Sequence, residues 1–227
     1  MSHGTRFALL CCGLCTTVAF AAPEAPRRLE RVTAARLCTD DGRIDVAGAH
    51  TLRTASPGMR ATVAGDASRV AELVFRYLGP SDGSAPLANG ELRRQIGLKL
   101  RAKDSCNVVY VMWHVEPTSG IFASVKRNPG AATHEQCGAG GYTNLPNLGA
   151  TQPRPLRVGE WHRLRAEIDG SVLRVTADGV PAWERPLPPQ AFEFDGPAGV
   201  RSDNGDFEFE LLLPAPAKGP EPRSCPH

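Results

Sequence analysis

The sequence lacks a strong excess of charge of either sign, an internal repeat and a long apolar segment. Its 26 lysines and arginines against 24 aspartates and glutamates leave 26 − 24 = +2, which gives no electrostatic reason to expect a nucleic-acid partner. No motif recurs at a fixed spacing, which disfavours a solenoid or a propeller. Charged residues (22%) and hydrophobic residues (41%) occur at ordinary frequencies, which argues against global disorder and against a coiled coil. A chain of 227 residues can bury one sizeable core.

The single extended apolar stretch lies near the N-terminus. It runs from Phe7 to Phe20 and is shorter than the roughly 20 residues that span a bilayer. Arg6 precedes it, and Ala19-Phe20-Ala21 is a small-x-small cleavage signal. Residues 1–21 therefore predict a signal peptide and a secreted or periplasmic protein without stable membrane insertion after cleavage. The alternative is an N-terminal membrane anchor.

Signal cleavage would leave four cysteines. An even number in an exported chain indicates two disulfides. Cys106 and Cys137 flank a predicted hairpin on the same side, so we pair them, and Cys225 would then reach back to Cys38. A zinc site made of Cys106, Cys137 and a histidine is the alternative, although the chain has no C-x-x-C pair.

Most of the chain alternates between apolar and polar residues, with Asp-Gly turns between the segments. This pattern is typical of antiparallel strands with one solvated face. Residues 70–78 fit both helix and strand spacing, and we expect a strand because every neighbouring segment is one. The clearest of the predicted strands cover residues 70–78, 92–101, 109–116, 122–128, 162–168, 173–177, 180–185 and 206–211.

Nine or more short strands without a convincing long helix predict an all-β fold, a two-sheet antiparallel β-sandwich. We expect residues 22–36 to be an N-terminal linker, residues 37–213 to form the sandwich, and residues 214–227 to be a Pro-rich tail tied by Cys225. Residues 128–161 are rich in Gly, Pro, Asn and Thr and predict a long ordered loop, and loops of this length are usually functional or disordered.

The last third of the chain carries a family resemblance. Gly159-Glu160-Trp161-His162-Arg163-Leu164-Arg165, the strand pair that ends at Asp178-Gly179, and Gly199-Val200-Arg201-Ser202-Asp203-Asn204 before Phe207-Glu208-Phe209 form the pattern. It resembles concanavalin A-like lectin/glucanase jelly rolls, including laminin-G-like modules, and above all the 3-keto-disaccharide hydrolase-type domain. The resemblance covers residues 155–213 clearly and residues 60–130 by strand pattern alone. It implies two stacked sheets, one of them concave, and carbohydrate as the commonest class of ligand.

Three of the predicted strands, at residues 92–101, 109–116 and 122–128, are the middle strands of the chain. If they are neighbours in one sheet, their polar sides share one surface. Such a surface could bind sugar hydroxyls and attract a carboxylate or a sulfate. Tyr142, in the long loop, is the best aromatic candidate beside it. The alternative to a binding surface is an ordinary solvated sheet face. The candidate ligand-binding residues are Arg93, Gln95, Lys99, Arg101, Tyr110, His114, Glu116, Ser124, Lys126 and Tyr142.

The leading hypothesis is a secreted carbohydrate-binding protein without catalysis. An enzyme on the same fold is the second. Tyr110, His114, Arg93 and Gln95 supply the residue types of a polysaccharide lyase, but the Gln-x-His and Tyr-Lys-Gly-Tyr strands of that family are absent. A glucanase motif starts at Glu193-Phe194-Asp195 and lacks its last carboxylate. The third hypothesis is an adhesion or structural module that binds a protein.

We expect no cofactor, and calcium is the alternative. Asp41, Asp203 and Asp206 are its candidate ligands, although ordinary Asp/Asn-Gly turns explain both Asp40-Asp41-Gly42 and Asp203-Asn204-Gly205-Asp206. Among the tryptophans, Trp113 falls on the valine side of its strand and is predicted to be core. Trp183 is predicted to be the tryptophan best placed to stack on a sugar ring.

Overall fold

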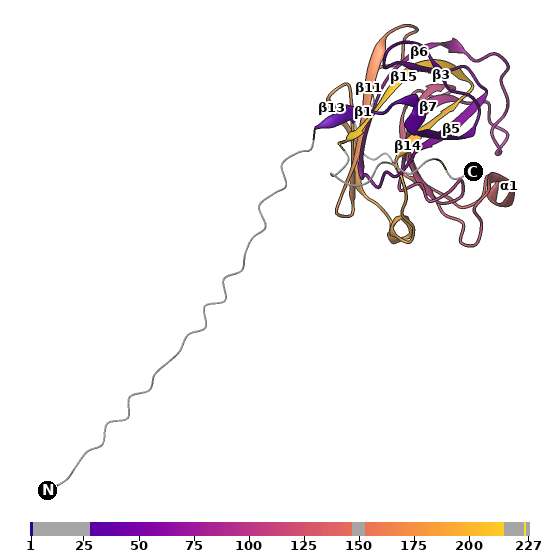
Figure 1. The fold of residues 1–227 in the computed structure, drawn as a ribbon. Coiled ribbons are helices and arrows are strands. Elements are labelled where there is room, and N and C mark those ends of the chain that lie inside the picture. The colour runs from indigo at the N-terminus through magenta and orange to yellow at the C-terminus, as the bar shows by residue number, and fades with distance from the viewer. Residues whose placement is uncertain (2–27, 147–152, 216–224, 226–227) are drawn as a thin grey trace.

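The computed structural model describes residues 1, 28–146, 153–215 and 225, and these residues form two antiparallel sheets that pack face to face (Figure 1). The predicted all-β sandwich is therefore confirmed. Apart from residue 1, the expected signal peptide lies outside the described residues, as does most of the tail beyond residue 215.

The first sheet has the strand order β13-β12-β11-β6-β15-β4-β3, and β1 pairs with β15 beside this path. Its strands all lie before residue 81 or after residue 160. Their bounds are β1 Leu29–Arg31, β3 Asp45–Val46, β4 Leu52–Thr54, β6 Val70–Pro80, β11 Trp161–Asp169, β12 Val172–Ala177, β13 Val180–Pro186 and β15 Gly205–Pro214.

The second sheet has the order β10-β9-β8-β7-β14-β5-β2. Its bounds are β2 Leu37–Asp41, β5 Gly58–Val63, β7 Arg94–Leu100, β8 Val108–Glu116, β9 Gly120–Lys126, β10 Tyr142–Leu145 and β14 Gly199–Asp203. Three short helices complete the described elements: η1 Ala34–Arg36, α1 His134–Cys137 and η2 Pro189–Phe192. No helix in the described part of the chain is long and apolar enough to cross a membrane.

The ambiguous segment at residues 70–78 is a strand, as predicted. In β6 the side chains of Ala71, Leu73 and Phe75 are fully buried, while Arg76 points outward and pairs with Glu208 of β15. The segment is a strand and not a helix because β6 pairs with β11 on one side and with β15 on the other. Both neighbours show the same alternation of buried and exposed side chains.

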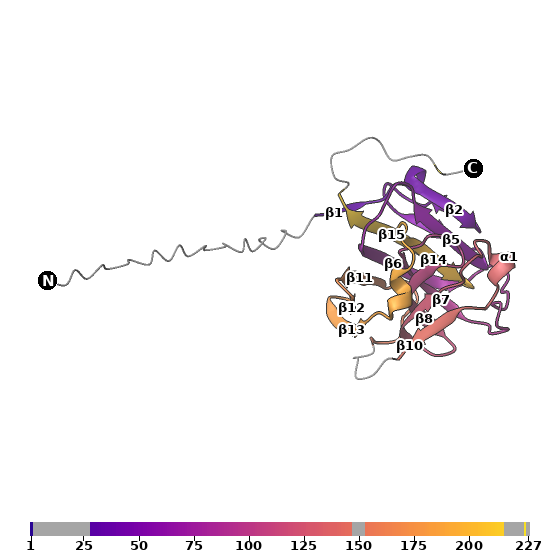
Figure 2. The ribbon, with the colours of Figure 1, turned by 90° about the horizontal axis from the view of Figure 1, so that it is seen from below.

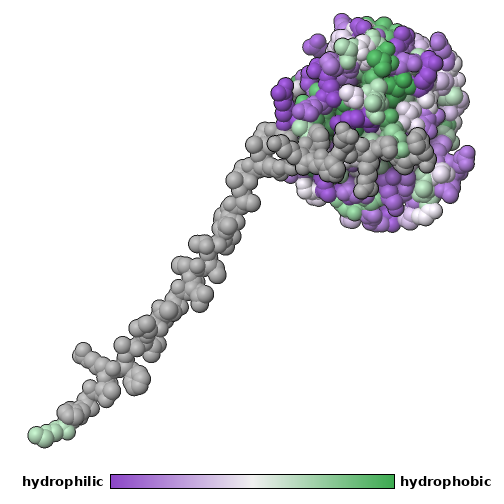
Figure 3. Space-filling view, in the orientation of Figure 1, coloured by the Kyte–Doolittle hydropathy of each residue, from purple (hydrophilic) through white to green (hydrophobic). Residues whose placement is uncertain are grey.

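One hydrophobic core fills the space between the two sheets. Trp113 of β8 is fully buried, as predicted, and its ring meets that of Phe75 edge-on at a centroid separation of 5.6 Å. The prediction that Trp183 stacks on a sugar ring is wrong. Trp183 pairs with Val175 across β12 and β13 and is only 2% exposed, so it belongs to the core and is not available to a ligand. Hydrophilic residues cover most of the surface visible in Figure 3.

Part of the segment expected to be a linker belongs to the sandwich. Within residues 22–36, β1 pairs with β15, Val32 is buried in the core, and η1 follows. The side chain of Val32 gives this segment a reason to pack, because it covers an end of the core. The ordered domain therefore begins before residue 37.

Both predicted disulfides are present. Cys38 of β2 bonds to Cys225, and Cys106, just before β8, bonds to Cys137 of α1. The first bridge ties the tail to the second sheet, as expected. The second joins the sheet to the long segment at residues 128–161, which contains α1 and β10.

Candidate functional site

The polar residues of the middle strands lie on the face of the second sheet that points away from the first sheet. Figures 1 and 2 both place α1 on this outer side, beyond β14 and β7. The register puts Gln95 opposite both His114 and Asp203, and Tyr110 opposite Ser124. The predicted neighbourhood of the three strands is therefore correct, and β10 and β14 extend it on either side.

A groove of about 630 Å³ runs over this face, a size in the range of small-molecule sites. Six of the ten predicted ligand-binding residues line it: Arg93, Gln95, Tyr110, His114, Ser124 and Tyr142. The sequence prediction missed other lining residues. These include Arg60, Met112, Phe122, His134, Asn144, Arg201 and the loop residues Leu87, Ala88, Asn89 and Glu91.

Four predicted binding residues do not line the groove. The Nζ atom of Lys99 lies 3.3 Å from Asp40 Oδ2 and the residue is 1% exposed. Arg101 has a φ of 52°, and its guanidinium donates to the carbonyl oxygens of Ala191 and Phe194.

Lys126 and Glu116 leave the predicted surface for different reasons. Lys126 is also 1% exposed, because its Nζ atom donates to the carbonyl oxygens of Gly138 and Ser105 at 2.9 and 3.3 Å. Glu116 pairs with Arg94 at the end of β8. The alternation of polar and apolar residues placed Lys99, Arg101, Glu116 and Lys126 on the correct side of the sheet or at its end. The segments that cover the sheet and the salt-bridge partners of these residues then keep them out of the groove.

A buried ionic network forms one side of the groove. Asp203 of β14 accepts hydrogen bonds from Gln95 Nε2 at 2.6 Å and from Arg201 Nε at 2.8 Å, and Arg60 of β5 lies 3.4 Å away. Burial opposes the charge on both Asp203 and Arg201. Arg201 and Arg60 nevertheless hold the pKa of Asp203 below its usual value, and Asp203 holds the pKa of Arg201 above its usual value.

His114 and Phe122 form an aromatic pair on adjacent strands. Their rings stack with centroids 4.0 Å apart and an interplanar angle of 17°. Burial, with a smaller contribution from the nearby Arg93, lowers the pKa of His114 to about 3. The imidazole is therefore neutral at physiological pH, with one nitrogen that donates and one that accepts.

Tyr142 of β10 forms the second aromatic position. Its ring stacks on Tyr110 at a centroid separation of 6.2 Å, and its hydroxyl oxygen accepts a hydrogen bond from Arg201 Nη1 at 3.3 Å. Lys126 Nζ lies 5.2 Å from the centre of the Tyr142 ring. Burial lowers the pKa of Lys126 to about 8, with smaller contributions from Arg201 and Arg60. Tyr142 remains 38% exposed, so part of this side chain is open to a ligand.

Two side-chain atoms in the groove residues lack hydrogen-bond partners among the residues that the structure describes. They are Gln95 Oε1, an acceptor, and Arg93 Nε, a donor. A buried polar atom without a partner is costly, and such atoms in a groove are satisfied by water or by a ligand. Both atoms are shielded from solvent, so they reach a ligand only when the Gln95 and Arg93 side chains turn toward the groove.

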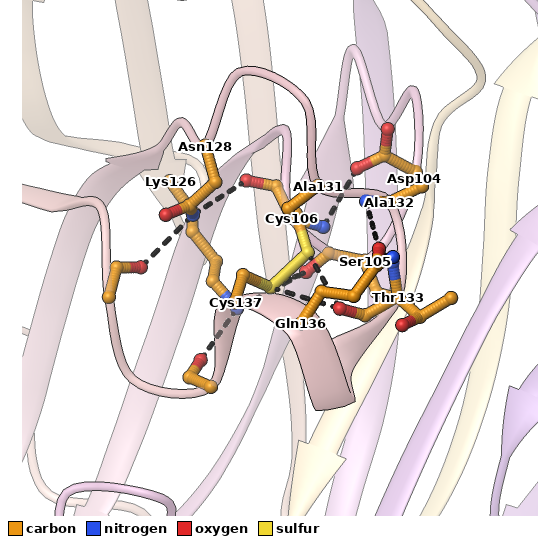
Figure 4. Close-up of a disulfide and its surroundings, with 12 residues drawn as sticks. Asp104, Ser105, Cys106, Lys126, Asn128, Ala131, Ala132, Thr133, Gln136 and Cys137 are labelled. Atoms are coloured by element: carbon orange, nitrogen blue, oxygen red, sulfur yellow. Dashed lines mark hydrogen bonds between the residues drawn. A yellow bond between two sulfur atoms is a disulfide. The ribbon is translucent and has the colours of Figure 1, made fainter.

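The wall formed by α1 is held covalently. Figure 4 shows the Cys106–Cys137 bridge between the sheet and α1, with Lys126 beside it. Gln136 Oε1 also accepts hydrogen bonds from the backbone N–H groups of Ala132 and Thr133, which fixes the start of the helix. His134 and Gly138 of this segment line the groove. The bridge also removes Cys137 as a nucleophile or zinc ligand.

The opposite wall, residues 81–93, is held by Asn204. Its Oδ1 accepts from the backbone N–H of Ala85 at 2.8 Å, and its Nδ2 donates to the carbonyl oxygens of Ala85 and Arg93. Asn204 adopts a φ of 56°, which this residue type tolerates better than most. Rigid elements therefore fix both ends of the site.

The calcium candidates each bind an arginine. Asp41 pairs with Arg60, Asp203 with Arg201, and Asp206 with Arg53 of the first sheet. No group of three or more histidine, cysteine, aspartate or glutamate side chains within the described ranges is arranged to hold a metal ion. Calcium dependence stays an untested prediction.

Comparison with known proteins identifies the fold and no closer relationship. No family model matches the sequence, and no curated protein matches it. Among solved structures, the carbohydrate-binding module CBM66 from Bacillus subtilis is similar, with a TM-score of 0.53 and 13% identity over 77% of this chain and 92% of that one.

Two further solved structures are more distant. The metal-free carbohydrate recognition domain of Emp46p is 7% identical over 80% of this chain and 89% of that one, with a TM-score of 0.48. LamAcat from Zobellia galactanivorans is 12% identical over 72% and 77%, with a TM-score of 0.42. At 13% identity, the likeness to the carbohydrate-binding module shows the fold alone, a two-sheet jelly roll. The finer resemblance to 3-keto-disaccharide hydrolase-type domains stays a prediction.

Proposed function

We propose that the protein is a secreted carbohydrate-binding protein and that its ligand lies in the groove on the outer face of the second sheet. The observation that carries the proposal is the combination of exposed aromatic surface with polar side chains in one groove. The fold shared with a carbohydrate-binding module supports it as an analogy.

The chemistry of the groove suits a sugar. The ring of Phe122, which is 37% exposed, and that of Tyr142 offer apolar surface to the C–H groups of a pyranose or furanose. The neutral imidazole of His114 and the side chains of Ser124 and Asn144 line the groove, and each of these groups can both donate and accept a hydrogen bond. A hydroxyl both donates and accepts, so a polyol matches this mixed set better than a purely apolar ligand does.

A glycan array probed with the purified protein tests the proposal. We expect binding to a defined set of glycans that is lost in His114→Ala and retained in Glu208→Ala, which alters an ion pair on the other sheet. Absence of binding to every glycan, or equal loss in both variants, would contradict the proposal.

Secretion is part of the proposal and rests on the predicted signal peptide and on the two disulfides. Expression of the full chain in a bacterium with an oxidising periplasm should yield periplasmic protein whose N-terminus is residue 22. Recovery of only uncleaved, membrane-associated chain would favour the anchor alternative.

A polysaccharide lyase is the second candidate function. It is supported by the observation that Tyr110, His114, Gln95 and Arg93 all line one groove. A neutral imidazole can take the proton next to a uronate carboxyl group as a carbon–carbon double bond forms and the glycosidic bond breaks, while the Tyr110 hydroxyl donates a proton to the departing oxygen. Uronate polymers incubated with the protein would then gain ultraviolet absorbance, and both Tyr110→Phe and His114→Ala would abolish the gain. A flat absorbance with every uronate polymer would remove this candidate.

A further inference from the structure

We propose that the groove selects uncharged glycans and rejects those that carry uronate or sulfate groups. This inference rests on the proposed function, and it departs from the expectation that the arginines of this face attract an anion. It follows from how each cation is paired and from which partner of each pair is exposed.

Each guanidinium that lines the groove already has a carboxylate. Arg60 pairs with Asp41, Arg93 with Glu91, and Arg201 with Asp203. Arg201 makes two hydrogen bonds to Asp203, from Nε at 2.8 Å and from Nη2 at 3.3 Å, so an incoming anion would compete with an intramolecular partner. The paired charges cancel, which leaves these three arginines without a net attraction for an acidic sugar.

In the pairs that reach the surface, the carboxylate is the more exposed partner. The Asp41 side chain is 52% exposed and that of Arg60 is 15%, while Glu91 is 35% exposed and Arg93 is 24%. Lys99 and Asp40, beside the groove, repeat the pattern with 2% and 43%. Glu91 itself lines the groove, so a ligand there meets this carboxylate beside Arg93, and a like charge on the ligand is repelled.

The other basic groups near the groove do not reverse this balance. Lys126 is buried, and its ammonium group is held by two carbonyl oxygens. Burial lowers the pKa of both His114 and His134, so both imidazoles are predominantly neutral at pH 7. The groove therefore has no uncompensated, exposed positive charge among its described residues.

A matched pair of polymers separates charge from backbone structure. Dextran and dextran sulfate share one sugar chain, so binding of both is measured by biolayer interferometry at low and high salt, beside a glycan array. The test variant is Asp41→Asn with Glu91→Gln, which removes the two exposed carboxylates. The control is Asp169→Asn with Glu184→Gln, which makes the same charge change around Arg174 on the first sheet.

We expect the array hits of the wild-type protein to be uncharged glycans. The test variant should bind dextran sulfate about tenfold more tightly than the wild type, with the gain lost at high salt and absent from the control. No gain over the control, or array binding confined to acidic glycans and lost in His114→Ala, would overturn the inference and leave the proposed function standing. No binding to any array glycan would remove the proposed function and this inference together.

Discussion

Ion pairs on the outer faces of the two sheets differ in which partner is exposed, although both faces have the same kind of sequence pattern. Where β15 pairs with β4 and β6 in the first sheet, the arginine is the more exposed partner: Arg53 is 47% exposed against 15% for Asp206, and Arg76 is 35% exposed against 16% for Glu208. Where β2 pairs with β5 in the second sheet, the carboxylate is the more exposed partner, as with Asp41 and Arg60. Alternation alone therefore does not determine which charge a sheet presents to solvent.

The two faces also differ in what covers them. The second sheet carries α1, held by Cys137, and the loop held by Asn204, so polar side chains such as Gln95 and Arg201 lie beneath and between these segments. Ion pairs on the first sheet stay partly solvated. Buried polar groups need specific partners, whereas solvated ones do not, so we expect mutations on the two faces to have different energetic consequences.

The largest difference is expected from the ion pairs. Asp203→Ala leaves the buried guanidinium of Arg201 without its main partner and should cost about 3–5 kcal/mol in the free energy of unfolding. Glu208→Ala on the first sheet removes a partner of the part-exposed Arg76 and should cost less than about 1 kcal/mol. Urea denaturation measures both, and equal losses would refute the distinction between the faces.

The next largest effect concerns the wall of the groove. Replacing Cys106 and Cys137 with serine opens a bridge with a sequence separation of 31 residues and should cost about 3 kcal/mol in stability. Glycan affinity should fall as well, because His134 and Gly138 lose their anchor. Denaturation and array binding measure the two effects. An unchanged stability together with four reactive thiols in the unfolded mature protein would contradict the bridge.

The pH dependence of the free energy of unfolding tests whether His114 is buried as a neutral imidazole, which sets it apart from the solvated side chains of the first sheet. Its folded pKa, about 3, lies below the unfolded value near 6.5, so the unfolded chain binds more protons between these values. The stabilisation is present above pH 6.5 and is lost as the pH falls toward 3, by about 2 kcal/mol at pH 5. His114→Gln should remove this component of the pH dependence, and identical slopes for wild type and variant would contradict the burial of a neutral imidazole.

The smallest effect compares two exposed aromatic residues, one from each sheet. Tyr142 lies in the groove, whereas Trp161 lies on the first sheet with Arg76 5.0 Å from the centre of its ring. Tyr142→Ala should weaken glycan binding about tenfold, and Trp161→Ala should leave it unchanged. Calorimetric titration with one array glycan measures both, and the reverse result would move the binding site to the first sheet.

Much of the fold could be predicted because local patterns determine it. The alternation at residues 162–177 and the turn at Asp169-Gly170 give the β11–β12 hairpin, and the even number of cysteines gives the two bridges. Val32 was missed as a core residue because a single valine before the first clear strand carries no periodicity.

The site was predictable only in part. Gln95 and His114 were found because their strands are consecutive in the sequence. Arg60 and Arg201 were missed because β5 and β14 reach the groove through long-range pairing, although the alternation of Val200, Arg201, Ser202 and Asp203 already placed Arg201 and Asp203 on one side of their strand. Trp183 was assigned outward because the irregular pairing near Val175 is not visible in the sequence.

Amide hydrogen exchange, measured with and without the tightest-binding array glycan, tests the location of the site most directly. We predict slower exchange in residues 81–93 and in residues 120–145, which include β9, α1 and β10, with unchanged exchange in β11, β12 and β13. Protection confined to β11–β13, with none around the groove, would contradict the account.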